Sequence, residues 1–411
     1  MVTNHVLSQG TGDPPHVFAV YPGFLLRRKT TMRWTFKSLA LLGTVTLLFF
    51  NAAPFPKTRL VQENSANNSR MMQSMSYEPA RILEGPLESC VPQNSVYFLK
   101  TPKCASSTIS QIFIAYGVKH GLTFALPVHY TLVPISPRIL PPEYNASPDG
   151  RHNMVVSHIQ FSKEGAEQVL KVSAKYVATV RKPASRFESM WYYGNYEKRF
   201  HLDLTTFLIA SNHTPRHKQK FNLIANYFGV KDPRDDVPEG EVLSKARWLN
   251  ETFDLVMVAE RFDESLVLLK HLMCWNTEDV VYLKAKIRKP TYRAKLSEAQ
   301  KERLRQLNRQ DVILYKFFRE IFEEKVKAFG EERMQREVEE LRHANAQLTK
   351  DCGAKLTGSR GTVKTWEVTN NSSICKLISQ STYSTQNQLK DRQRIWVSSN
   401  FTYDLLTWTF T

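Results

Sequence analysis

The sequence predicts an α/β protein with a central, mostly parallel sheet in a three-layer arrangement, and two observations lead to this prediction. Short apolar runs typical of buried strands alternate along the chain with longer segments of helical periodicity. Parallel strands need long crossover connections, so this alternation favours helices on the faces of the sheet. Strands are expected at residues 95–99, 153–157, 175–180 and 253–259. Helices are expected at residues 107–120, 163–171, 184–193, 262–273, 297–308 and 311–320.

The first predicted strand runs into a loop rich in cationic and hydroxyl side chains, Lys100–Thr108 (KTPKCASST). A helix follows, and Ser106–Thr108 are candidates to cap it. A helix N-terminus offers unpaired N–H groups and partial positive charge, so it binds phosphate or sulfate readily, and Lys103 adds a full charge. The loop has no glycine and its lysine comes early, unlike a Walker A loop. An ATPase or kinase of the usual P-loop type is therefore not expected.

A second predicted strand ends in another candidate anion site, within VATVRKPASRFES (177–189). Arg181 follows the strand directly, and Ser189 comes eight residues later. Two such sites about 75 residues apart suggest a nucleotide with phosphates at both ends. Ligands of parallel sheets bind at the carboxyl ends of the strands. The residues expected at or just past these ends are Lys103, His158, Arg181 and Glu260.

Six segments in order give the chain a resemblance to a known family. They are FLKTPKCASST (98–108), KHGLTFALP (119–127), VVSHIQF (155–161), VRKPASRFES (180–189), FDLVMVAERFDESLVLLKHLMCW (253–275) and AFGEERMQREVEELRHAN (328–345). Together they resemble the Golgi carbohydrate sulfotransferases, and most closely the galactose-3-O-sulfotransferases. The resemblance extends over roughly Cys90–Cys352, and it does not cover residues 1–85 or 355–411.

This resemblance implies a P-loop-like sulfotransferase fold and a specific reaction. The sulfonyl donor would be 3′-phosphoadenosine-5′-phosphosulfate (PAPS), the acceptor the 3-hydroxyl of a galactose, and no metal would be needed. Lys103 would stabilise the leaving oxygen, and His158 would act as general base, with Glu188 and Glu260 as alternates. Arg181 and Ser189 would bind the 3′-phosphate. The donor's 5′ end would be bound by Lys100, Thr101, Lys103, Cys104, Ala105, Ser106, Ser107 and Thr108.

Three questions about the acceptor stay open at this point. The galactose could belong to a glycolipid such as galactosylceramide or to a glycan. The aromatic run Trp191–Tyr193 could stack on a sugar or belong to the core, and the basic residues Lys284, Lys286 and Arg288 could contact nucleotide or acceptor.

Two other functions remain as alternatives: a uronyl 2-O-type sulfotransferase acting on glycosaminoglycans, and an inactive type II membrane protein that binds glycans.

The chain divides into five predicted parts. Residues 1–35 form a cytoplasmic tail, 36–55 a transmembrane signal anchor, 56–89 a polar lumenal stem, 90–353 the catalytic domain and 354–411 an unassigned C-terminal tail. The span of 20 mostly apolar residues matches the thickness of a bilayer, and the basic residues before it favour a cytoplasmic N-terminus. A cleaved signal peptide is the alternative. We therefore expect a single-pass type II protein of the Golgi membrane.

Charge and cysteine content add further expectations. The formal net charge of +17 suits an enzyme that binds an anionic nucleotide, and no nucleic-acid-binding module accompanies it. Five cysteines are too scattered for a zinc site, and Cys90 with Cys352 is the first candidate disulfide. Cys104 is interpreted as a small residue of the anion loop rather than a redox-sensitive thiol. Sequons at Asn67, Asn145, Asn212, Asn250, Asn370, Asn371 and Asn400 fit a lumenal setting.

A long charged helix is predicted at Glu323–Lys350. Its apolar positions are close to heptad spacing, which leaves two interpretations. The helix packs against the catalytic domain, or it forms a homodimer with a second copy of the chain.

Overall fold

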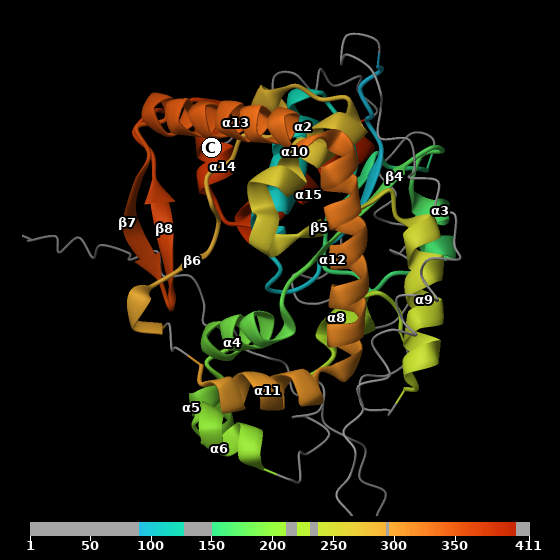
Figure 1. Cartoon of the computed structure of the whole chain (residues 1–411). Helices are drawn as coiled ribbons and strands as arrows, with labels where there is room; N and C mark the ends of the chain where they lie inside the picture. The colour runs from blue at the N-terminus through green and yellow to red at the C-terminus, as the bar shows by residue number, and fades with distance from the viewer. Residues whose placement is uncertain (1–89, 127–149, 211–219, 231–236, 293–295, 400–411) are drawn as a thin grey trace, which may run out of the picture. The chain divides into compact units, whose positions relative to one another are not determined.

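The computed structural model describes residues 90–126, 150–210, 220–230, 237–292 and 296–399 (Figure 1). The predicted signal anchor at 36–55 and stem at 56–89 lie outside these residues, as do the sequons at Asn67, Asn145, Asn212 and Asn400. Among the helices in the described ranges, none combines the length and the apolar character needed to cross a membrane.

A parallel sheet of five strands forms the centre of the fold, as the sequence predicts. Its order is β2-β3-β1-β4-β5, and every neighbouring pair is parallel. The strands are β1 (Val96–Leu99), β2 (Phe124–Ala125), β3 (Met154–Val155), β4 (Lys175–Val180) and β5 (Leu255–Val258). Sequence analysis located β1, β3, β4 and β5. It missed β2, because two residues are too few to show a strand period.

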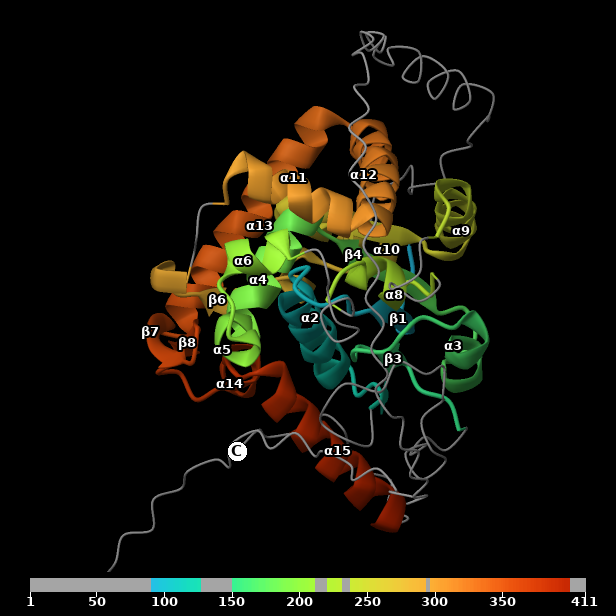
Figure 2. The same ribbon diagram turned by 90° about the horizontal axis from the view of Figure 1, so that it is seen from below.

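Helices cover both faces of this sheet. Successive side chains of a strand point to opposite faces of the sheet, so neighbouring residues of β1 pack against the layers on both faces. Phe98 packs against Phe113 of α2 (Ser106–Lys119), and Phe113 packs against Trp275, which follows α10 (Phe262–Met273). On the other face, Tyr97 contacts Phe161 and Tyr176. The layer beyond them contains α8 (Leu223–Tyr227), α9 (Glu239–Thr252) and α12 (Arg309–Phe329) (Figure 2).

Five further helices flank the sheet: α3 (Lys163–Val169), α4 (Pro183–Tyr193), α5 (Tyr196–Phe200), α6 (Leu204–Ile209) and α11 (Glu298–Leu307). Helix α3 packs into the main core, and the other four build a second, smaller apolar cluster. The cluster is formed by α4, α5, α6 and α11, and its aromatic core includes Phe187, Trp191 and Phe207. Trp191 is therefore a core residue, which decides against sugar stacking for this member of the aromatic run.

The helix predicted at Glu323–Lys350 is in fact two helices. Gly330, with a φ of 92°, ends α12 and begins α13 (Glu331–Asp351). Such a φ is open to glycine but strained for other residues, so the chain turns there. The apolar positions Val338 and Leu341 are buried in the main core, and His271 of α10 lies 2.6 Å from Glu337 of α13. The stripe therefore packs within the chain, and this face is not available to a second copy.

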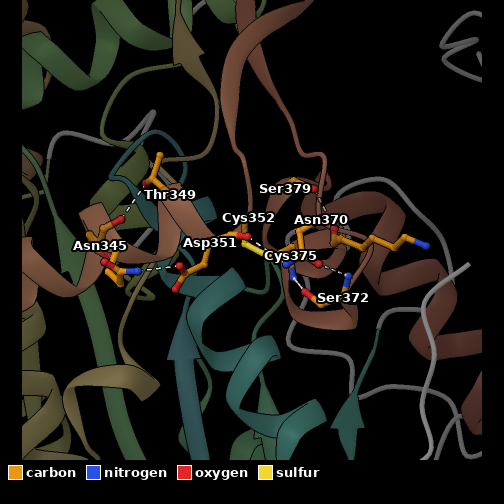
Figure 3. Close-up of a disulfide and its surroundings, with 10 residues drawn as sticks. Asn345, Thr349, Asp351, Cys352, Asn370, Ser372, Cys375 and Ser379 are labelled. Carbon is orange, nitrogen blue, oxygen red and sulfur yellow. Dashed lines mark hydrogen bonds between the residues drawn. A yellow bond between two sulfur atoms is a disulfide. The ribbon is translucent and has the colours of Figure 1, made fainter.

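The expected disulfide between Cys90 and Cys352 is wrong. The structure pairs Cys90 with Cys274 and Cys352 with Cys375. Backbone bonding explains the first pair, because the N–H of Gln93 donates to the carbonyl of Met273 at 2.8 Å and so brings Cys90 to the end of α10. Cys352 closes α13 and lies next to the start of α14 (Ser373–Ser379) (Figure 3).

Most of the unassigned C-terminal tail has a defined structure. Strands β7 (Lys355–Arg360) and β8 (Val363–Glu367) form a hairpin, and β8 pairs with β6 (Ile287–Arg288) in a second sheet of order β6-β8-β7 (Figure 1). Helices α14 and α15 (Thr382–Ser399) pass alongside α2 (Figure 2). The buried Gln111 amide of α2 donates to the carbonyl of Leu377 and to Thr385 Oγ1. The tail is thus attached to the α/β core through α2.

Candidate active site

The four residues expected at strand ends lie where the sequence places them. Lys103 follows β1 and His158 follows β3, while Arg181 directly follows β4 and Glu260 follows β5. Because the strands are parallel neighbours, their carboxyl ends share one edge of the sheet. The structure brings the first three together around the loop between β1 and α2.

That loop takes a strained backbone that its surroundings hold in place. Lys103 and Ala105 have φ values of 64° and 59°, in the left-handed region that favours glycine. Each costs about 1–2 kcal/mol for an L-residue with a side chain. Two residues at the end of β4 and directly after it offset this cost. Thr179 Oγ1 donates to the carbonyl of Cys104 at 3.0 Å, and Arg181 Nη1 donates to the carbonyl of Lys103 at 3.0 Å.

The hydroxyls of this loop do not cap α2, which corrects one expectation. Ala105 is the N-cap, and no side chain caps the first turn of this described helix. The hydroxyl of Ser106 donates instead to the carbonyl of Thr101 at 2.6 Å, and Thr108 Oγ1 accepts from the N–H of Ala285 at 3.0 Å. The first turn therefore presents backbone N–H groups without a side-chain partner, which is the arrangement that binds phosphate and sulfate.

Cations crowd around this helix end. Burial is the main cause that lowers the pKa of Lys103 to about 7, and the nearby charges of Lys286, Arg181 and Arg288 add to it. Burial and Lys286 also hold the pKa of Lys100 well below its usual range. The ammonium of Lys103 lies 3.8 Å from the ring centre of Tyr193, and that of Lys286 lies 5.1 Å from the same ring. This concentration of positive charge favours an anionic ligand.

His158 is oriented for proton transfer. Its Nδ1 lies 2.6 Å from the carbonyl oxygen of Lys100, so the neutral ring donates from Nδ1 and leaves Nε2 as an acceptor. Burial, with the charges of Lys100 and Lys286, keeps the pKa of His158 well below its usual value. The imidazole is therefore neutral near pH 6–7, the form that a general base requires.

The two other candidate bases, Glu188 and Glu260, already accept hydrogen bonds within the protein. Glu188 Oε1 accepts from Arg288 Nη1 at 3.0 Å, and Glu260 Oε1 accepts from the backbone N–H of Lys182 at 2.9 Å. Glu260 also receives a longer bond of 3.4 Å from the hydroxyl of Tyr315. These carboxylates orient cationic and backbone groups of the site, which favours His158 as the base.

The segment that carries Arg181 and Ser189 is fixed by a buried ion pair. Both residues belong to the β4–α4 unit, Arg181 at the strand end and Ser189 within the helix, partly buried. Arg186, between them, lies fully buried at 3.5 Å from Asp311 of α12, and it donates to Asn308 at 3.2 Å. Because a charge pair removed from water must be held closely, this contact fixes α4 against α12.

Cys104 is buried and is a free thiol, and its pKa is raised to about 12, mainly by burial. A thiol of this kind is not reactive, which supports its interpretation as a small residue of the loop.

Within the described ranges, no group of three or more histidine, cysteine or acidic side chains is arranged to hold a metal.

Sequence analysis missed the contribution of the C-terminal segment to this site. Strand β8 pairs with β6, and β6 immediately follows Lys286. A signal was present in RGTVKTWEV (360–368), where β-branched residues follow a glycine turn. Gly361 indeed has a φ of 56° at the turn between β7 and β8.

Comparisons with known proteins identify the family to which this chain is similar. The model of the galactose-3-O-sulfotransferase family matches residues 26–363. Galactosylceramide sulfotransferase of Mus musculus is 33% identical over 298 residues, 67% of this chain and 68% of its own. The Homo sapiens protein of the same name is 31% identical over 334 residues, 76% and 77% of the two chains. Galactose-3-O-sulfotransferase 3 of Mus musculus is 33% identical over 283 residues, 63% of each chain.

Proposed function

Because the chain belongs to the galactose-3-O-sulfotransferase family, we propose that it transfers a sulfonyl group from PAPS to the 3-hydroxyl of a galactose residue. The acceptor would be a glycolipid resembling galactosylceramide, or a galactose-terminated glycan. We propose that the reaction takes place in the Golgi lumen, with the chain anchored by residues 36–55 as a type II membrane protein.

One observation carries this proposal: cations of three separate segments meet at an uncapped helix N-terminus. Lys103 precedes α2, Arg181 follows β4 and Lys286 precedes β6. Like charges repel, so the arrangement is most stable when an anion lies among them. A nucleotide with phosphate groups at both ends supplies that charge at two points, which matches the separate positions of the loop and of Arg181 with Ser189.

The residues fit the chemistry that such a donor needs. When bound, PAPS supplies a sulfonyl group on a phosphate leaving group. His158 Nε2 accepts the proton of the attacking galactose hydroxyl. Lys103 and the N–H groups at the start of α2 stabilise the negative charge that develops on the leaving oxygen. Arg181, with its planar guanidinium, binds the 3′-phosphate together with Ser189.

The acceptor would approach across the aromatic side chains at the end of α4. Tyr193 is 44% exposed, although Trp191 of the same run is buried. An exposed ring that Lys103 of the anion loop contacts can stack on the apolar face of a galactose. Some relatives are named for galactosylceramide and others for galactose alone, so both acceptor classes belong in the test.

Transfer of labelled sulfate from PAPS tests the proposal directly. The panel holds galactosylceramide, lactosylceramide, N-acetyllactosamine, a core 1 disaccharide and desulfated heparan. We expect transfer to a galactose acceptor, and its loss in both Lys103→Ala and His158→Ala. The variant His120→Ala, at the exposed end of α2, is the matched control and should retain activity.

Other outcomes would identify the alternatives. The net charge of +17 also suits a polyanionic acceptor, and transfer to heparan alone would assign the chain to uronyl sulfation. Nucleotide binding without transfer to any acceptor would indicate an inactive glycan-binding protein. Protease protection of intact Golgi vesicles tests the topology, because a lumenal catalytic domain must survive until detergent is added.

A further inference from the structure

We propose that the C-terminal hairpin β7–β8, attached through the Cys352–Cys375 disulfide, positions Lys286 at the anion loop, with Trp366 as a positioning residue for donor binding. The inference rests on the proposed function, because it names the segment that completes the donor site. It assigns a role to residues 355–375, which sequence analysis left unassigned.

Lys286 lies between two attachments to the hairpin. On its N-terminal side, the indole N–H of Trp366 donates to the carbonyl of Lys284 at 3.0 Å. On its C-terminal side, Ile287 and Arg288 pair with Lys364 and Val363 of β8. The backbone N–H of Lys289 adds a bond to the carbonyl of Thr362 at 3.0 Å. The hairpin therefore holds this stretch from both ends.

The opposite side of the same stretch faces the candidate active site. The N–H of Ala285 donates to Thr108 Oγ1 in the first turn of α2 at 3.0 Å. The ammonium of Lys286 lies over the Tyr193 ring, which it shares with Lys103. Lys286 thus reaches the loop from a backbone that the hairpin supports.

The backbone of Lys286 itself is strained. Its φ of 53° lies in the left-handed region, and such a residue persists only where its surroundings fix it. The surroundings are the contacts named above, to β8 and to Trp366 on one side and to Thr108 on the other. A strained lysine held among other cations is unfavourable in isolation, and a bound anion would compensate for it.

The hairpin needs an attachment of its own, because a two-stranded hairpin alone is marginally stable in water. The disulfide provides it by joining the end of α13 to α14 (Figure 3). The N–H groups of Thr369 and Asn370 donate to the carbonyl of Cys352 at 3.1 and 3.2 Å. Trp366 packs in the apolar cluster that contains the disulfide and Leu283. The loop closed by the disulfide contains both strands of the hairpin.

The test measures binding of the product nucleotide, 3′-phosphoadenosine 5′-phosphate, to the full chain in detergent by calorimetry. Trp366→Phe keeps an aromatic ring in the cluster and removes the N–H donor together with part of the ring. We expect its dissociation constant to rise about three- to tenfold, as the loss of one hydrogen bond implies. KM for PAPS should rise equally, while KM for the galactose acceptor stays unchanged. Trp248→Phe on α9, remote from the site, is the matched control.

A double-mutant cycle tests whether Trp366 acts through Lys286. Lys286→Ala should weaken nucleotide binding, and adding Trp366→Phe to it should cause no further loss. Additive losses would overturn the proposal, because Trp366 would then act independently of Lys286. Equal affinity of wild type and Trp366→Phe would also overturn it.

Removing the disulfide gives a second test. Cys352→Ala/Cys375→Ala should weaken nucleotide binding, whereas Cys90→Ala/Cys274→Ala, which removes the other disulfide, should not. Unchanged affinity in the first pair would contradict the role of the attachment. Failure of the proposed function is a different result. A wild-type chain that neither binds the nucleotide nor transfers sulfate overturns both proposals. A wild type that binds the nucleotide, with variants of the same affinity, overturns only the role of the hairpin.

Discussion

The low pKa of Lys103 predicts how activity depends on pH. Burial and three neighbouring cations lower this pKa from 10.5 to about 7, so the side chain loses its proton as the pH rises through neutrality. Only the protonated form stabilises an anionic donor. We therefore expect kcat/KM for PAPS to be highest at mildly acidic pH and to fall above pH 7, by about tenfold per pH unit where Lys103 alone titrates.

The acidic side of the profile should be flat over the same range. The pKa of His158 lies well below its usual value, so the ring stays neutral and able to accept a proton at pH 6. A bound donor brings negative charge next to Lys103, which raises the pKa of this lysine. At saturating PAPS, the alkaline decline of kcat should consequently move to higher pH than that of kcat/KM.

Initial rates between pH 5.5 and 9, at low and at saturating PAPS, measure both profiles. Lys103→Arg keeps the charge at every pH tested, because a guanidinium does not deprotonate in this range. The variant should lose the part of the alkaline decline that Lys103 causes, whatever its absolute rate. Lys119→Arg, on the exposed end of α2, is the control and should keep the wild-type profile. A wild-type kcat/KM that stays constant to pH 8.5, or an identical decline in Lys103→Arg, would refute this reasoning.

Three further predictions follow from individual contacts. His158→Ala should lower kcat by about 10²- to 10⁴-fold, the usual contribution of a general base, while calorimetry shows nucleotide binding retained; an unchanged kcat would exclude His158 as the base. Arg181→Ala should weaken binding of 3′-phosphoadenosine 5′-phosphate at least tenfold more than binding of adenosine 5′-phosphate, since only the former carries the 3′-phosphate; equal losses would contradict the assignment. Gln111→Ala should lower the free energy of unfolding by about 1–3 kcal/mol, because the carbonyl of Leu377 loses a buried donor; chemical denaturation measures it, and Gln347→Ala, at an exposed position of α13, is the control.

Local patterns along the chain determined most of the sheet and the core of the candidate site. The apolar runs that form β1, β4 and β5 are short, buried and bounded by polar residues, so their period and their ends were visible. Parallel pairing then placed Lys103, His158 and Arg181 at one edge, because residues that follow parallel strands meet there. The family resemblance rested on the same segments, and the family comparison confirmed it.

Only the tertiary structure decided the contacts between segments distant in sequence. The disulfide partners depend on which distant segments meet, as Cys90 before β1 meets Cys274 after α10. The predicted capping of α2 by Ser106 and Thr108 was wrong, because their hydroxyls form hydrogen bonds with the backbone of Thr101 and Ala285 instead. The place of Lys286 depends on the pairing of β6 with β8, some 75 residues later in the chain. The spacing of apolar residues along the chain shows which local segments form buried strands and helices. The contacts named here join segments far apart in the sequence, and they form only when the packed elements bring those segments together.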